Sequence, residues 1–379
     1  MKIVHLTTVA SSHRYLLLPQ LVALSRAGHE VVAVSAPGSD TAALERRGIR
    51  FVPLPGSTRG VDPAADLRAA RSFAAIVRAE RPDLVHTHNP KPGVYGRVVA
   101  RLLGVPRVVN TVHGLYATPT DPISRRTVVY GLEAMASRCS HLELVQNTED
   151  LALMERTRLA PRGRARLLGN GIDVDRYRPR TDPGPRRRIR AELGLPPDAT
   201  LVVTVGRLVA EKGIRELLAA SARLDARHHL VVIGPDDPAK RDALPAAWRR
   251  EAEQRGVRFL GHRADLDLLL PACDLFVLAS YREGVPRAAM EAAACGLPLV
   301  ATDVRGCRQV VADGVNGLLV PARRVEPLAR AIRRLVTDPE LRRRLAGRSR
   351  PKAVREFDQR DVIGRLFAAY AELGVPGPA

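Results

Sequence analysis

The chain has 379 residues, 45% of them hydrophobic and 4% aromatic, and a formal net charge of +20 from 60 basic and 40 acidic side chains. This length suits two domains of roughly 150–200 residues better than one, and the apolar content excludes a largely disordered chain. The positive charge is spread over both halves, without a zinc-finger, RNA-recognition or basic-aromatic pattern, so we expect no binding to nucleic acid.

The first half of the chain alternates short apolar runs with longer helical patterns. The runs lack polar alternation, so each strand would have both faces buried, as in a parallel sheet between layers of helices. We expect strands over residues 2–9, 31–36, 51–54, 83–88, 107–114, 141–146 and 165–169. We expect helices up to residue 28, over 64–79, up to 103 and over 123–138. This order predicts one doubly wound, Rossmann-like domain over residues 1–170.

Residues 176–188 hold prolines, a glycine and many charges without an apolar run, a composition typical of a linker. We therefore place a crossover linker at 171–198. Further strands are expected over 200–206, 229–234, 257–261, 274–280, 297–302 and 317–321, and helices from about 212, over 240–254 and from Pro286.

Residues 199–351 thus predict a second Rossmann-like domain. The expected fold class is α/β, with two doubly wound parallel-sheet domains facing each other across a cleft. The last helical stretch, 352–373, would pack back on the first domain as part of a C-terminal segment, 352–379.

Polar residues that follow the strands are the candidate ligand contacts, because ligands of open α/β sheets bind outside the carboxyl ends of the strands. The sequence GRLVAEKG places Gly206, Arg207 and Lys212 after one strand and at the start of the next helix. A planar guanidinium and an ammonium at a helix N-terminus suit a diphosphate. Two solvated surface cations are the alternative. The chain holds no GxxxxGK[ST] motif of a P-loop.

The sequence YREGVPRAAMEAAACGLP follows the strand at 274–280. Pro286 suits the first position of a helix, which leaves the amides of Gly284 and Val285 at the mouth of that helix. Glu283 lies just before the helix, and Glu291, five residues after Pro286, lies roughly 7.5 Å along the helix axis at about 1.5 Å per residue. A nucleotide sugar would span this distance, with sugar hydroxyls near Glu283, ribose hydroxyls near Glu291 and a phosphate favoured by the helix dipole.

In the first half, His88 and Asn89 follow one expected strand and His113 follows the next. If these strands are neighbours, both groups lie at the same edge of the sheet. Histidines that end strands by chance are the alternative. We do not expect His86 and His88 to bind a metal, because no third ligand with suitable spacing appears.

These motifs resemble those of glycosyltransferase family 4, retaining enzymes of GT-B fold. The resemblance rests on GRLVAEKG, FLGHRADL, SYREGVPRAAMEAAACGLPLVATDVRG and VADGVNGLLVP. LGNGIDVDRY is similar to the inter-domain crossover of the family. HNPKPGVYGR and VVNTVHGLY are similar to bacterial members that build capsule, O-antigen and exopolysaccharide repeat units.

The resemblance implies a role for each candidate. Arg207 and Lys212 would hold the donor diphosphate, Glu283 the transferred sugar and Glu291 the ribose. The region Gly261 to Arg263 would flank the base, and His113 would contact the donor sugar at the reaction centre. The expected catalytic residues are His113, Arg207, Lys212 and Glu283. The expected donor-binding residues are Gly206, Arg207, Lys212, Arg263, Glu283, Gly284, Val285 and Glu291.

The loop after the first strand departs from the family. Many members carry a Gly-Gly loop there, whereas this chain has TTVASSHRY. Ser12 and His13 would supply polar contacts on the acceptor side instead, together with His88 and Asn89.

We expect no metal and no other cofactor. The triplets Asp173-Val174-Asp175 and Asp265-Leu266-Asp267 do not follow strands, where a bridge from a metal to a diphosphate would be needed. The cations at 207 and 212 would already stabilise a leaving diphosphate.

No apolar run approaches the roughly 18 residues of a membrane span, and the first residues lack the pattern of a signal peptide. We therefore expect a cytoplasmic protein. The apolar cluster at 16–24 most simply belongs to the core. A hydrophobic edge that docks, with Arg14 and Arg26, at the inner face of a membrane is the alternative.

The sequence therefore predicts a retaining glycosyltransferase of hexosyl or N-acetylhexosaminyl type. It would move a sugar from a nucleotide-diphosphate donor, UDP-linked, to a glycan or polyprenyl-linked saccharide in polysaccharide biosynthesis. Natural-product glycosylation, a nucleotide-sugar epimerase of GT-B fold and a non-catalytic nucleotide-sugar-binding protein are the alternatives.

Overall fold

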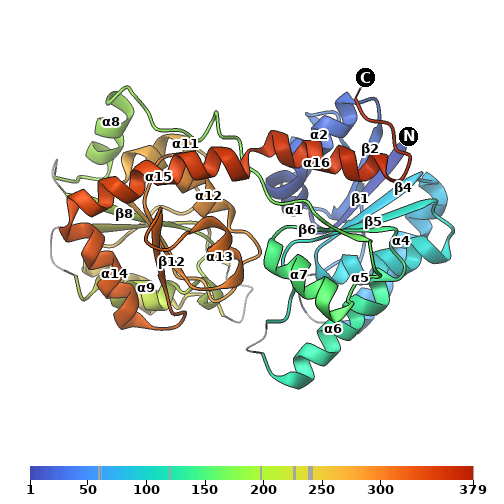
Figure 1. Ribbon diagram of the computed structural model, residues 1–379, viewed down its shortest axis with the longest axis horizontal. Helices are drawn as coiled ribbons and strands as arrows, with labels where there is room; N and C mark the ends of the chain where they lie inside the picture. The colour runs from blue at the N-terminus through green and yellow to red at the C-terminus, as the bar shows by residue number, and fades with distance from the viewer. Residues whose placement is uncertain are drawn as a thin grey trace. The chain divides into compact units, whose positions relative to one another are not determined.

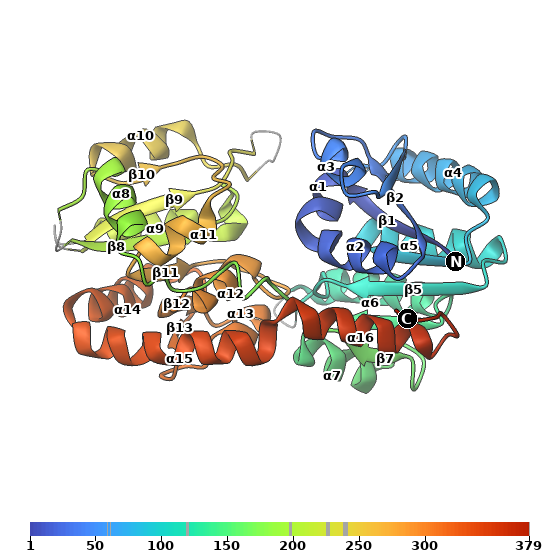
Figure 2. The ribbon, with the colours of Figure 1, turned by 90° about the horizontal axis from the view of Figure 1, so that it is seen from above.

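The computed structural model describes residues 1–58, 60, 62–118, 121–196, 199–224, 228–237 and 242–378. The chain divides into two compact units, Met1–Gly169 with Arg360–Ala379, and Asn170–Gln359 (Figure 1). Each unit contains one parallel sheet with helices on both faces, which confirms the expected α/β fold with two Rossmann-like units (Figure 2). The helix expected over 240–254 begins at Ala246, and residues 240 and 241 lie outside the described residues.

The first unit has a seven-stranded sheet in the order β3-β2-β1-β4-β5-β6-β7. Its strands are β1 (Lys2–Val9), β2 (Glu30–Ala36), β3 (Arg50–Pro53), β4 (Leu84–His88), β5 (Arg107–Val112), β6 (Leu142–Val145) and β7 (Ala165–Leu167). The first strand lies inside the sheet because β1 pairs with β2 on one side and with β4 on the other. All five residues of β4 are buried, as expected for a strand covered on both faces.

Helices connect these strands. They are α1 (Ala10–Ser12), the π-helical turn η1 (His13–Leu17), α2 (Leu18–Arg26), α3 (Thr41–Glu45), α4 (Pro63–Glu80), α5 (Pro90–Leu102), α6 (Ile123–Ser137) and α7 (Thr148–Thr157). The apolar cluster at 16–24 belongs to the core, since Leu17, Leu21 and Leu24 are buried and Leu16 and Leu18 pack against them.

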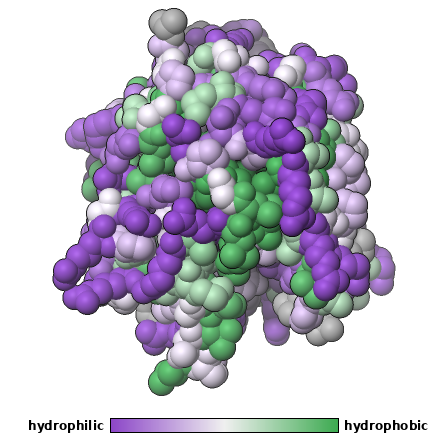
Figure 3. All heavy atoms as spheres, turned by 90° about the vertical axis from the view of Figure 1, so that its right-hand side faces the viewer, coloured by the Kyte–Doolittle hydropathy of each residue, from purple (hydrophilic) through white to green (hydrophobic). Residues whose placement is uncertain are grey.

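None of the described helices is long and apolar enough to cross a membrane. Hydrophilic side chains cover most of the face drawn in Figure 3, and hydrophobic side chains gather near its middle.

The second unit has a six-stranded sheet in the order β10-β9-β8-β11-β12-β13. Its strands are β8 (Thr200–Val205), β9 (His228–Ile233), β10 (Arg258–Phe259), β11 (Leu275–Leu278), β12 (Leu299–Thr302) and β13 (Gly317–Val320). Its helices are α8 (Gly184–Glu192), η2 (Ala210–Lys212), α9 (Ile214–Ser221), α10 (Ala246–Gln254), α11 (Leu266–Leu269), η3 (Leu270–Ala272), α12 (Arg287–Ala294), α13 (Arg305–Val310), α14 (Val325–Thr337) and α15 (Pro339–Phe357).

We expected a linker at 171–198, but its described residues, 171–196, lie within the second unit and contain helix α8. Ile189 of this helix is buried in the core of the unit. Arg186 and Arg190 bind the two carboxylate oxygens of Asp274, at 2.7 and 3.2 Å. The apolar side chains of this segment are thinly spaced among its many charges, so the sequence pattern did not reveal the helix.

The chain returns to the first unit at its end. The single helical stretch expected over 352–373 consists of the end of α15 and of α16 (Gln359–Ala371). They are separated at Asp358, which has extended backbone and pairs with Ile172. Val362, Leu366 and Tyr370 of α16 are buried in the core of the first unit.

A buried ion network joins α5 to the sheet. Arg97 is fully buried and donates to Glu143 Oε1 at 2.6 Å and to Glu133 Oε1 at 2.8 Å. Asn110 Nδ2 donates to the second oxygen of Glu143 at 2.8 Å, and Thr87 Oγ1 donates to Asn110 Oδ1 at 2.8 Å. Burial raises the pKa of Glu143 and the neighbouring Arg97 opposes that shift. The two buried charges therefore depend on each other.

We expect Arg97→Leu to destabilise the protein by about 3–5 kcal/mol, because it leaves the Glu143 carboxylate buried without its counter-ion. Urea denaturation at pH 7 measures this loss. Arg101→Leu is the matched control, since Arg101 is an exposed residue of the same helix. Equal losses in the two variants would contradict the importance of the network.

Candidate functional site

The expected cation pair lies beyond the carboxyl end of β8. Arg207 follows that strand directly and Lys212 ends the short helix η2. Gly213 comes next, with φ of +65°, and a Cβ atom there would lie 2.0 Å from the carbonyl oxygen of Ala279. Only glycine allows this approach, which brings the loop after β8 against the end of the neighbouring strand β11.

Both cations are paired with carboxylates. Lys212 Nζ lies 2.6 Å from Glu283 Oε1, and Ser280 Oγ donates to the same oxygen at 2.6 Å. Arg207 Nη1 lies 2.8 Å from Asp237 Oδ2. The structure therefore brings the predicted residues Lys212 and Glu283 together. Sequence reasoning missed Asp237, although it follows a strand of the same sheet.

The loop before α12 packs tightly. Pro286 has an extended backbone and precedes the helix, so the prediction that it is the first helical residue was wrong by one position. A Cβ atom on Gly306 of α13 would lie 2.1 Å from the carbonyl oxygen of Gly284. Val285 is buried, and its carbonyl oxygen accepts a hydrogen bond from Asn170 Nδ2 at 3.1 Å. These contacts fix the backbone that joins Glu283 to the helix.

Glu291 lies on α12 with 6% of its surface exposed. Burial raises the pKa of its carboxyl group, and the positive charge of Arg287 opposes this shift. Arg287 Nε donates to Glu291 Oε1 at 3.0 Å and also contacts the carbonyl oxygen of Gly171. Sequence reasoning missed Arg287, although the spacing of four residues on a helix indicates such a pair.

The second Asp-x-Asp triplet, Asp265-Leu266-Asp267, forms ion pairs with arginines. Asp265 pairs with Arg263 at 2.8 Å, and hydrogen bonds from Arg263 to Asp265 and Glu192 raise the pKa of the guanidinium. Asp267 pairs with arginines 176 and 180 at 2.9 and 3.3 Å. The predicted base contact Arg263 is thus held between two carboxylates.

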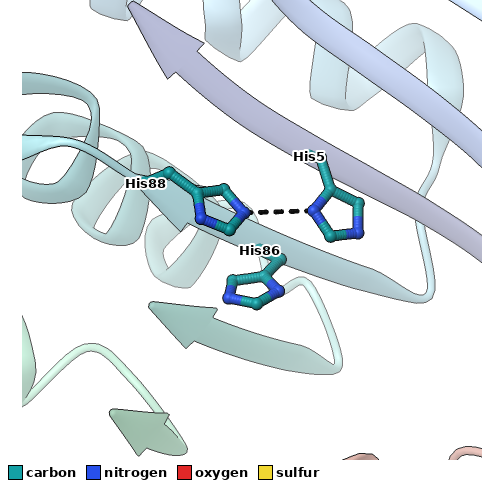
Figure 4. A group of neighbouring side chains, drawn as sticks. All are labelled: His5, His86 and His88. Atoms are coloured by element: carbon teal, nitrogen blue, oxygen red, sulfur yellow. Dashed lines mark hydrogen bonds between the residues drawn. The ribbon is translucent and has the colours of Figure 1, made fainter. Parts of the chain in front are cut away.

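Histidines gather at the centre of the first unit. Strands β4 and β5 are neighbours, and His88 Nδ1 lies 3.0 Å from His113 Nε2. His88 Nε2 in turn lies 3.1 Å from His5 Nδ1 (Figure 4). The expected proximity of His88 and His113 is therefore observed. Sequence reasoning missed His5, which faces His86 across the parallel pairing of β1 with β4.

His86 completes a group of three imidazoles whose ring nitrogens lie within 4.8 Å of one another. We found no third ligand by spacing in the sequence, and the structure supplies one in His5, 81 residues away. Both nitrogens of His86 already have other partners, Tyr370 Oη at 2.8 Å and Thr111 Oγ1 at 2.7 Å. The group contains three neutral donors and no carboxylate.

The remaining acceptor-side residues differ in exposure. Asn89 has φ of +67°, and its Oδ1 accepts a hydrogen bond from the Thr8 amide at 3.2 Å. Ser12 is half-buried at the end of α1. His13 is fully buried, with Nε2 donating to the carbonyl oxygen of Val34 at 3.2 Å, so its ring does not reach the surface.

Burial lowers the pKa of every histidine in this region. It lowers the pKa of His5 to about 3 and the pKa values of His13 and His113 to about 4. It also lowers the pKa values of His86 and His88 well below the ordinary range. These imidazoles are therefore neutral at pH 7.

These lowered pKa values predict a loss of stability in mild acid. The unfolded chain takes up protons below pH 6.5 and the folded chain does not, so each such histidine costs about 2 kcal/mol between pH 7 and pH 5. We expect His13→Gln, which retains a donor for Val34, to remove about 2 kcal/mol of this loss in urea denaturation. Between pH 7 and pH 8 the two proteins should change in parallel. An unchanged loss in the variant between pH 7 and pH 5 would contradict the prediction.

Both halves of the chain match models of known protein families. Residues 20–176 match Glycosyltransferase Family 4, and residues 185–351 match Glycosyl transferases group 1. The chain is 28% identical over 333 residues to a UDP-Gal:alpha-D-GlcNAc-diphosphoundecaprenol alpha-1,3-galactosyltransferase of Escherichia coli, with 86% of this chain and 85% of that protein covered. It is 32% identical over 308 residues to a D-inositol 3-phosphate glycosyltransferase of Saccharomonospora viridis, with 76% and 70% covered.

A solved structure supports the same fold. Anabaena Alr3699/HepE in complex with UDP and glucose has a TM-score of 0.81 to this chain at 22% identity, with 98% of this chain and all of that chain covered. At this identity the likeness shows the GT-B fold alone.

Proposed function

The chain belongs to the glycosyltransferases of family 4, and on that basis we propose that it moves a sugar from a UDP-sugar to a hydroxyl group of a glycan or polyprenyl-linked saccharide. The observation that carries the proposal is the contact of Lys212 with Glu283 at 2.6 Å, beside Arg207. It unites a cation suited to a diphosphate with a carboxylate suited to sugar hydroxyls at the carboxyl ends of neighbouring strands.

The leaving diphosphate is the centre of the proposed mechanism. Arg207 and Lys212 would exchange their carboxylate partners for the diphosphate and stabilise the charge that develops as the sugar departs. Glu283 would bind hydroxyl groups of the sugar, and His113 would contact the same sugar. No covalent intermediate on Glu283 is proposed, and the sugar would be transferred with retention. Two cations would serve without a metal ion.

The rest of the donor would lie along α12. Glu291 would accept hydrogen bonds from the ribose, and the region of Arg263 would flank the base. The E. coli relative is named for a UDP-galactose donor and a diphosphoundecaprenol-linked acceptor, which supports a UDP-sugar and a polyprenyl-linked saccharide here. Such an acceptor would bring the protein to the inner face of a membrane, so we propose a cytoplasmic protein with peripheral contact there.

Nucleotide binding is the first test. We expect UDP, added without metal, to raise the melting temperature, because a ligand at about 100 times its Kd stabilises the folded state by roughly 2.7 kcal/mol. Glu291→Ala should reduce this shift. Arg223→Ala, which breaks a surface pair with Glu326, is the matched control and should keep it. No shift with UDP, UDP-glucose or other nucleotides in the folded protein would favour a non-catalytic role.

Turnover is the second test. We expect Arg207→Ala and Lys212→Ala to lower turnover of a UDP-sugar by roughly 10²–10³, if each cation acts like one donor of an oxyanion hole. The release of UDP with and without a saccharide acceptor measures this rate. Unchanged turnover in both variants would overturn the assignment, and conversion of the UDP-sugar without release of UDP would indicate an epimerase.

A further inference from the structure

Three imidazoles form a row from the core of the first unit toward its surface. His5 on β1 and His88 on β4 are 0% and 1% exposed, whereas His113 after β5 is only half-buried. His5 Nδ1 is 3.1 Å from His88 Nε2, and His88 Nδ1 is 3.0 Å from His113 Nε2. Figure 4 shows the first of these two links. His88 therefore uses both of its nitrogens inside the row.

The direction of the row follows from the nitrogen at its buried end. Each neutral imidazole carries one N–H, so every link has one donor and one acceptor. Among the residues that the structure describes, none is a hydrogen-bond partner of the buried Nε2 of His5. A proton there would leave a buried N–H without an acceptor, which is rarer and costlier than an unused lone pair. The proton of His5 thus lies on Nδ1 and is donated to His88.

The same argument assigns the position of the proton on the other two imidazole rings. His88 accepts at Nε2, so it donates from Nδ1 to Nε2 of His113. His113 must then carry its own proton on Nδ1. The side chain of Gln146 hydrogen-bonds to the His113 ring, and its amide oxygen can accept this proton.

We propose that His5 and His88 are positioning residues, which hold His113 in one orientation and with its proton on Nδ1 through this one-way row of hydrogen bonds. The inference rests on the proposed function, in which His113 contacts the transferred sugar. The row would give that sugar a fixed N–H donor, with Gln146 accepting the proton while the donor substrate is absent. Neither His5 nor His88 would need to touch the substrate.

His86 shows that burial among histidines does not by itself produce such a row. Its ring centroid is 4.2 Å from that of His88, but its nitrogens bond to Thr111 and Tyr370. Loss of His86 would therefore damage the same part of the core without breaking the links to His113. It is the matched control for His88.

The functional test compares His88→Leu, His88→Asn and His86→Leu. Turnover is measured as UDP release from whichever of UDP-glucose, UDP-galactose and UDP-N-acetylglucosamine raises the melting temperature most. We expect His88→Leu to lower kcat about tenfold or more, because a slightly misplaced group is costly in a catalytic site. His88→Asn, whose amide nitrogen can replace Nδ1, should recover most of this loss.

The comparison separates positioning from stability. His86→Leu should lower the melting temperature as much as His88→Leu but change kcat by less than about threefold. Equal losses of kcat in His86→Leu and His88→Leu, or no recovery in His88→Asn, would overturn the proposal.

A spectroscopic test reads the tautomer directly. In protein labelled with ¹⁵N in its histidine rings, His113 should show a protonated Nδ1 and an unprotonated Nε2 at pH 7, and His88→Leu should mix the two forms. A proton on Nε2 of His113 in the parent would overturn the inference. So would stoichiometric zinc held by His5, His86 and His88, measured by metal analysis after incubation with zinc. If the parent binds no UDP, the proposed function fails, and the nitrogen shifts alone then decide whether the row exists.

Discussion

The parallel pairing of every strand is the constraint on which the rest of the structure depends. Strands covered by helices on both faces leave little room for chemistry along their length, so polar groups are available mainly where the strands end. Arg207 follows β8 and Glu283 follows β11. His88 is the last residue of β4, and His113 follows the neighbouring strand β5. The candidate residues of each unit therefore come together although they are far apart in the chain.

The first unit adds a less usual feature, because its sheet carries a polar network on each face. Side chains alternate along a strand, so His86 and His88 point to one face and Thr87 to the other. On one face the histidines meet Tyr370 of α16, and on the other Thr87 leads through Asn110 to Glu143 and Arg97 of α5. Buried networks of this kind stabilise only when their members are satisfied, so they also fix the positions of the strands. The neutral histidine row and the charged network thus hold the same two strands from opposite sides.

The sequence predicted this architecture well where strong local patterns exist. Continuous apolar runs marked the strands, and the residues after those runs included Lys212 and Glu283, which the structure joins. The sequence did not predict residues whose role depends on contacts with residues far away in the chain. His5 lies inside an apolar run. The register of β1 with β4 brings it next to His86, and no local sequence pattern predicts that register. Asp237 is identified only by its ion pair with Arg207 in the structure. Helix α8 was missed because its few apolar residues are spread among many arginines.

The cations of the proposed donor site are already paired with carboxylates before any substrate binds. Lys212 is paired with Glu283, Arg207 with Asp237 and Arg287 with Glu291. Side chains of Lys212 and Glu283 are only 23% and 10% exposed, so their attraction is screened less than that of a surface pair. A diphosphate must therefore exchange with carboxylates that already satisfy these cations, and its net affinity would be smaller than the sum of its new contacts. The same exchange would release Glu283 from Lys212 when the diphosphate binds. The carboxylate of Glu283 would therefore become available to the sugar only when the leaving diphosphate is present.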